Sequence, residues 1–289
     1  MSRPEHILPP ELFYNEKESS RYAQNSRILQ IQADLAQRAY DLLEIPQEDT
    51  TPKLLLDLGC GSGISGSILS EANHHWFGLD ISESMLQIAR ENEEISNFDL
   101  FLADLGQGLG FRAGSFDGAI SVSVLQWLCN ADKSCHNPAG RIHKFFSSLM
   151  IALARGSKAV FQFYPENEGQ IDLLTGIALK CGFGGGVVVD YPNSKKAKKY
   201  FLVLHSGYSG GIPAGLTGEA SSEGRQHAGR DSSTVRMLDN GRMGIKKRKG
   251  KNIKDKQWIL RKKELSRKRG NENVPRDSKY TARKRGPKF

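Results

Sequence analysis

Long apolar segments are missing from this chain of 289 residues, and cysteine is scarce. No apolar run approaches the ~20 residues that a membrane-spanning helix needs, so we expect no membrane association. The N-terminal sequence through Tyr22 has no apolar core of a secretory signal. Four cysteines without a CxxC pair exclude a disulfide framework and are typical of a reducing compartment.

A metal site is also poorly supported. Cys129, Cys135 and His136 lie close together in the sequence. Structural zinc sites use four ligands, and this group has no second half. We therefore predict no metal and interpret these residues as loop or half-buried positions.

Acidic residues become scarce after residue 205. Residues 1–205 carry 18 Lys/Arg and 24 Asp/Glu, a net charge of −6, whereas residues 206–289 carry 23 and 8, a net charge of +15; the sum is the total of +9. We predict an N-terminal helical cap over residues 1–52, an α/β domain over 53–207, a flexible Gly/Ser-rich linker over 208–244 and a disordered basic extension over 245–289.

Two periodicities support this division. Apolar residues recur at three- and four-residue spacing from Ile28 to Leu43, which predicts an amphipathic helix. From Lys53, short apolar runs alternate with helical patterns, one of which ends at Gly156. The alternation predicts a mostly parallel sheet of seven strands with helices on both faces. Ligands bind such sheets at the carboxyl ends of the strands.

The run LLLDLGCGSGISG, which begins at Leu54, carries the main ligand signal. Gly61, Gly63 and Gly66 satisfy a dinucleotide fingerprint, and Asp80 follows Gly59 by 21 residues. S-adenosylmethionine (SAM) is the stronger alternative. Its ammonium and sulfonium suit a carboxylate at Asp57, which would repel a pyrophosphate unless the carboxylate were turned away. A dinucleotide and a sheet that binds nothing are the other interpretations.

The pattern D-x-G-x-G-x-G from Asp57 resembles the first motif of class I SAM-dependent methyltransferases, a Rossmann-like α/β fold. In that superfamily an acidic residue at the end of the third strand receives the adenine amino group, and Asp104 stands there. Three acids at three consecutive strand ends are more specific than the glycines alone.

The methyl acceptor is narrowed only by elimination. The segment SVSVLQWLCNAD lacks the [ND]-P-P-[YF] element of adenine-N6 and glutamine methyltransferases, and no Pro-Cys nucleophile suits cytosine-C5 chemistry. A ring nitrogen such as guanine N7 needs neither, since positioning and water exclusion suffice.

Several motifs together resemble the eukaryotic small-subunit (18S) ribosomal RNA (guanine-N7) methyltransferase family. They are the N-terminal segment from PPELFYNEKES to QRAYDLL, then LLLDLGCGSGISG, FDGAISVSVLQWLCNAD, FQFYPEN, and the C-terminal KDKQWILRKKELSRKRG and SKYTARKR. The resemblance implies SAM-dependent N7-methylation of a guanine in 18S rRNA, coupled to 40S subunit biogenesis. It also implies a nuclear protein, nucleolar and nucleoplasmic, with cytoplasmic presence open.

The resemblance also implies the cofactor site. Asp80 would bind the ribose diol, and Asp57 would face the amino acid end, directly or through water. Tyr14, Arg21 and Tyr22 would close over SAM, with Arg21 meeting its carboxylate; a solvated helix face is the alternative for Arg21. The other implied cofactor residues surround the methionine, ribose and adenine parts: Gly59, Gly61, Gly63, Asp104 and Leu105.

For catalysis, the resemblance implies that Gln126 and Trp127 border the methyl group and that Tyr164 stacks on a splayed base. Packing roles are the alternative for Trp127 and Tyr164. The family also binds a small zinc-binding activator protein by pairing with its third strand, here Phe98–Leu102. A central buried strand is the alternative for that run.

The basic tail has its own prediction. Lys246 to Lys251 form a compact cationic run, and Trp258 and Tyr280 lie among further cations. Such a tail is typical of binding to RNA, pre-40S particles or import receptors. Two other functions stay open: a scaffolding assembly factor of pre-40S particles, or a methyltransferase acting on a small molecule or protein.

Overall fold

The computed structural model describes residues 3–46, 48–93, 95–131, 136–194, 197–207, 211–216 and 234–236, with Leu260, Lys263, Arg267, Arg276 and Asp277. Residues 1–239 form one compact unit and residues 240–289 a second. In the second unit, Lys263 and Arg267 each contact Asp277 at 3.0 Å. The cationic run from Lys246 to Lys251 lies outside the described residues, so its predicted role stays a prediction.

Four helical segments precede the sheet: η1 (Pro4–His6), α1 (Pro10–Phe13), α2 (Glu16–Ala23) and α3 (Ser26–Leu43). Asn15 and Asn25 cap α2 and α3, since their side-chain oxygens accept main-chain N–H groups of the first turn. The predicted apolar stripe is confirmed: Leu35, Ala39 and Leu42 of α3 are buried against the sheet.

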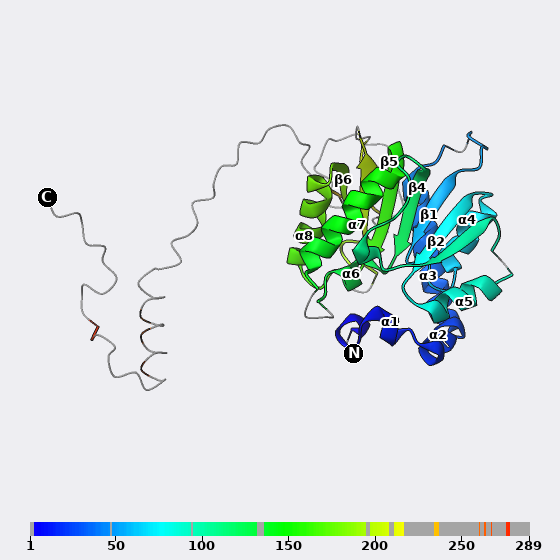
Figure 1. The fold of residues 1–289 in the computed structure, drawn as a ribbon. Coiled ribbons are helices and arrows are strands. Elements are labelled where there is room, and N and C mark those ends of the chain that lie inside the picture. The colour runs from blue at the N-terminus through cyan, green and yellow to red at the C-terminus, as the bar shows by residue number, and fades with distance from the viewer. Residues whose placement is uncertain are drawn as a thin grey trace. The chain divides into compact units, whose positions relative to one another are not determined.

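The sheet is built from alternating strands and helices (Figure 1). The elements are β1 (Leu54–Leu58), α4 (Ile64–Glu71), β2 (His75–Asp80), α5 (Glu83–Glu91), β3 (Phe98–Leu102), η2 (Leu105–Gln107), β4 (Phe116–Val122), α6 (Leu125–Leu128), α7 (Pro138–Ala152), β5 (Leu153–Phe163), α8 (Glu168–Lys180), β6 (Phe183–Asp190), β7 (Lys199–Ser206) and β8 (Thr234–Arg236).

The strand order is β3-β2-β1-β4-β5-β7-β6-β8. Strands β3, β2, β1, β4 and β5 are parallel, and β7 is antiparallel to both β5 and β6. The predicted mostly parallel arrangement of seven strands is confirmed for β1 to β7, and β8 adds an eighth strand at the edge beside β6. The order reverses between β1 and β4, which is where such sheets bind ligands.

The two sheet faces carry separate cores. On one, Leu55 of β1 packs with Leu42 of α3, Leu69 of α4 and Ala89 of α5. On the other, Leu56 and Leu58 of β1 belong to a core with side chains from α7 and α8. This alternation along β1 places helices on both faces, as expected for a buried parallel strand. No helix among the described residues is long and apolar enough to cross a bilayer.

Two sequence predictions of the fold were wrong in detail. The helix expected to end at Gly156 ends at Ala152, because Leu153 is buried and pairs with Phe116 as the first residue of β5. Gly156, with φ of 89°, lies inside β5, where the register with β4 shifts between Leu153 and Lys158. Within the predicted linker, β8 pairs antiparallel with β6. A strand of three residues is too short for periodicity to reveal.

Candidate cofactor and substrate site

A cavity of about 150 Å³ opens at the carboxyl ends of β1, β2, β3 and β4. The loops after these strands form its walls, and Pro10, Tyr14 and Tyr22 from the N-terminal helices also line it. The cavity therefore lies at the reversal of strand order, as the sequence analysis predicts.

The loop between β1 and α4 forms one wall of this cavity. Gly59, Gly61 and Gly63 have φ values of 81°, 52° and 83°. At Gly59 an added Cβ would lie 2.2 Å from Cγ2 of Val124, in the loop after β4. Glycine is needed at Gly59 because its backbone is left-handed and Val124 packs directly against it. Gly59 and Gly61 line the cavity as predicted, whereas Gly63 caps α4 behind it.

Asp80 holds this loop and faces the cavity. The Gly61 N–H donates to Oδ2 of Asp80 at 2.9 Å, and the Ser82 N–H donates to Oδ1 at 2.8 Å. Burial raises the pKa of Asp80, while these two hydrogen bonds oppose the shift. The carboxylate is fixed in orientation at the cavity wall, as a ribose-binding acid requires.

Asp57 lies beneath the glycine loop and does not line the cavity. It is fully buried, and its Oδ2 accepts the Ser65 hydroxyl at 2.6 Å. Its Oδ1 has no hydrogen-bond partner among the described residues. Burial raises its pKa to about 7, and the charge of Asp80 adds to the shift. Asp57 was expected at the ligand's amino acid end, directly or through water, but strand alternation turns it, like Leu55, toward α4.

Asp104 forms part of the wall after β3, together with Leu105. Its Oδ1 accepts the Gly106 N–H at 2.9 Å and Nη2 of Arg141 at 2.6 Å. Arg141, on α7, is buried and lines the cavity too. Sequence reasoning missed Arg141, but Gly106 carries a signal, because an added Cβ would lie 2.2 Å from Nε of Arg141.

Aromatic side chains line the cavity beside these acids. Trp127 is buried, and its ring lies 5.8 Å from that of Tyr14 and 5.9 Å from that of Phe13. Tyr14 and Tyr22 meet edge to face at 6.1 Å. Burial raises the pKa of Tyr14 to about 12, and burial raises that of Tyr22 as well. Both phenols are therefore neutral at physiological pH and act as apolar surface or hydrogen-bond donors, not as bases.

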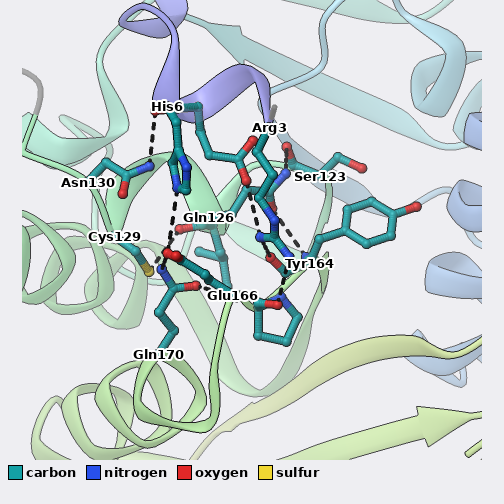
Figure 2. Close-up of polar contacts among 12 residues, drawn as sticks. Arg3, His6, Ser123, Gln126, Cys129, Asn130, Tyr164, Glu166 and Gln170 are labelled. Carbon is teal, nitrogen blue, oxygen red and sulfur yellow. Dashed lines mark hydrogen bonds and ion pairs between the residues drawn. The ribbon is translucent and has the colours of Figure 1, made fainter. Parts of the chain in front are cut away.

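Gln126 and Tyr164 are not among the residues that line the cavity. Figure 2 shows the polar contacts around them. Gln126 is buried, and its Nε2 donates to the Ser123 carbonyl at 2.8 Å, while its Oε1 accepts the Tyr164 N–H at 3.4 Å. Gln126 thus ties the end of β4 to the end of β5. Arg3 also binds the end of β5, because its guanidinium donates to the carbonyls of Tyr164 and Pro165.

The prediction that Arg21 closes over SAM meets a different geometry. The Arg21 side chain is 79% exposed and contacts Glu18 at 3.5 Å, so this structure does not bring it to the cavity. Helix α2 turns its neighbour Tyr22 inward and Arg21 outward.

Cys135 lies outside the described residues, and no group of three or more metal-ligating side chains occurs among those described.

Comparison with known proteins agrees with this geometry. The sequence matches a methyltransferase domain over residues 55–141, and a family described as a methyltransferase involved in Williams-Beuren syndrome over residues 204–287. The fold is similar to that of phosphoethanolamine N-methyltransferase 2 from Haemonchus contortus, solved in complex with SAM. The TM-score is 0.51 with 16% identity, covering 72% of this chain and 61% of the other. The fold is that of class I SAM-dependent methyltransferases.

Full-length relatives narrow the assignment. An 18S rRNA (guanine-N(7))-methyltransferase of Arabidopsis thaliana is 51% identical over 100% of this chain and 99% of its own. That of Mus musculus is 48% identical over 99% and 98%. The 18S rRNA (guanine(1575)-N(7))-methyltransferase of Saccharomyces cerevisiae is 45% identical over the whole of both chains. The chain therefore belongs to the 18S rRNA (guanine-N7)-methyltransferase family.

Proposed function

We propose that this protein uses SAM to methylate N7 of a guanine in 18S rRNA. The observation that carries the proposal is the full-length similarity to enzymes named for this reaction, combined with an acidic, aromatic cavity at the strand ends. When bound, SAM supplies an electrophilic methyl group on a positively charged sulfur.

The residues present fit SAM. The carboxylate of Asp80 is fixed by two main-chain N–H groups and keeps acceptor capacity for a ribose diol. Asp104 and the main-chain amide of Leu105 would meet the adenine. The glycine loop would hold the methionine part, with Asp57 buried behind it. Asp80 and Asp104 both line the cavity, which suits a cationic cofactor such as SAM better than the pyrophosphate of a dinucleotide.

The chain's own contribution to the reaction is positioning and exclusion of water. Guanine N7 carries an in-plane lone pair and loses no proton on methylation, so no general base is required. The neutral phenols of Tyr14 and Tyr22 and the indole of Trp127 line the cavity, which fits a site that acts by orientation.

We also propose that a small zinc-binding activator protein adds a strand to β3. This strand lies at the sheet edge and pairs only with β2 among the described strands. Phe101 and Leu102 are 39% and 61% exposed. An apolar edge with free main-chain groups favours strand addition and, without a partner, aggregation.

The same proposal places the protein in the nucleus, on pre-40S particles, with the tail of residues 245–289 supplying RNA affinity. The net charge of +15 after residue 205 supports this, since phosphate contacts dominate RNA affinity. Deleting residues 245–289 should weaken RNA binding and flatten its salt dependence. An unchanged salt slope would contradict the role of the tail.

The function is tested with tritiated SAM, the protein co-expressed with its activator, and 40S precursors from cells lacking the enzyme. Label in 18S rRNA supports the proposal. Label in protein or small molecules would indicate another substrate class. An Asp80→Lys variant that still restores subunit maturation would show that scaffolding is the main task.

A further inference from the structure

A dense group of lysines follows β6. The sequence YPNSKKAKKY, residues 191–200, contains four lysines and no acidic residue, although residues 1–205 carry a net charge of −6. Ser194 orders the described part of this turn. Its Oγ accepts the Ala197 N–H at 3.1 Å, and its carbonyl accepts the Lys198 N–H at 2.9 Å. The turn therefore presents Lys198 from a defined backbone position.

Lys198 and Lys199 point at aromatic rings instead of acids. Lys198 Nζ lies 5.0 Å from the centroid of the Tyr200 ring, and Lys199 Nζ lies 5.1 Å from that of Tyr164. Lys199 Nζ also donates to the Tyr164 hydroxyl at 3.3 Å. No carboxylate lies within ion-pair distance of either ammonium in the described part of the chain.

The acid opposite Lys199, Asp190, already binds other groups. Asp190 pairs with Lys199 in the β6–β7 register, but its carboxylate accepts Nε of Arg38 at 3.0 Å and the Leu216 N–H at 2.8 Å. The positive charge of Lys199 is therefore not neutralised at this strand pair. Tyrosine faces orient both ammonium groups and leave their charge available to an anion.

These cations flank the cavity. Tyr200 of β7 pairs with Phe163 of β5, and Gln162 of β5 pairs with Val122 of β4, which lines the cavity. Two strand spacings of ~4.8 Å separate β7 from β4, so the backbone of β7 lies on the order of 10 Å from the strand whose end lines the cavity. An RNA strand with one base in the cavity would pass close to these cations.

We propose that Lys198 and Lys199 bind backbone phosphates of the RNA strand whose guanine enters the cavity. This inference rests on the proposed function and adds the surface that positions its substrate. A local cationic surface is needed there, because the net-acidic part of the chain otherwise repels RNA.

The test uses the full-length protein with its activator and a fluorescein-labelled single-stranded fragment of 18S rRNA. Binding is titrated over a range of salt concentrations for wild type, K198A/K199A, K198R/K199R and the matched control K144A/K180A. The control removes two exposed lysines from α7 and α8, with the same change in net charge.

The salt slope is the slope of log binding constant against log salt concentration, and each lost phosphate contact on a single strand reduces its magnitude by ~0.7. The slope of K198A/K199A should therefore be smaller by about 1.4, which corresponds to about tenfold lower affinity near 0.15 M salt. K198R/K199R and K144A/K180A should keep the wild-type slope, and melting temperatures confirm folding. An unchanged slope in K198A/K199A, or an equal loss in K144A/K180A, would overturn the inference. The proposed function would be refuted instead if RNA binding depends on Lys198 and Lys199 as expected but wild type transfers no tritiated methyl group to rRNA.

Discussion

Replacing Asp80 with alanine tests the cofactor site most simply. The Asp80 carboxylate accepts two main-chain N–H groups, from Gly61 at 2.9 Å and from Ser82 at 2.8 Å. It would also accept the two ribose hydroxyls of SAM. Hydrogen bonds to a charged acceptor contribute about 1.5–3 kcal/mol each. Losing both ribose contacts costs about 3 kcal/mol or more, so SAM affinity should fall by about 100-fold.

Isothermal titration calorimetry of the protein with its activator measures this loss directly. The matched control is Asp172→Ala, which removes an exposed acid from α8, away from the cavity. Thermal unfolding separates lost binding from lost folding, because Asp80→Ala also leaves the Gly61 and Ser82 N–H groups without their acceptor. Binding by Asp80→Ala within about threefold of wild type, with the fold intact, would refute the assignment of the ribose site.

Three other predictions follow from single contacts. Asp57→Asn should flatten the pH dependence of stability: the folded pKa of Asp57 is about 7 against the usual 3.8, so wild type loses stability as pH rises from about 4 to about 7. The free energy of unfolding is measured with urea at pH 5 and pH 8. An equal change between the two pH values in wild type and in Asp57→Asn would contradict this. Arg141→Ala removes the 2.6 Å contact that orients Asp104 and should weaken SAM binding by about tenfold, a cost of about 1.4 kcal/mol; unchanged calorimetric affinity would exclude that role. Phe101→Asp should abolish co-purification with the activator, whereas Ile151→Asp, at an exposed apolar position on α7, should not; retention of the activator by Phe101→Asp would count against strand addition at β3.

The sequence predicted the parts of the site that depend on strand ends. Asp80 and Asp104 terminate runs that are apolar enough to be buried strands, and parallel strands bring their carboxyl ends to one edge. The glycine loop was predictable for the same reason. Asp57 shows the limit of this reasoning, because its position at a strand end did not reveal which face its side chain takes.

Contacts across long sequence distances were not predictable in the same way. Arg141 reaches Asp104 from α7, 37 residues away, and only the missing side chain at Gly106 hints at it. Gln126 was expected near the methyl group but ties β4 to β5 through two main-chain contacts. Which polar side chain faces a ligand depends on how loops pack, and hydrophobic periodicity carries no information about this.

Edge position was another property that composition left open. Phe98–Leu102 is apolar enough for a central strand, yet β3 ends the sheet and exposes Leu102. Only the strand order distinguishes the two cases. The short strand β8 at the opposite edge pairs with β6, and its three residues are too few for a periodicity to predict.

The most direct test of the central claim maps the methylated atom. 18S rRNA from cells lacking the enzyme, complemented with wild type or with Asp80→Lys, is treated by mild reduction and aniline, which cleave RNA at N7-methylguanine. We expect one cleavage site with wild type and none with Asp80→Lys at equal protein level. Cleavage that is absent with wild type, or that persists with Asp80→Lys, would contradict SAM-dependent guanine-N7 methylation by this cavity.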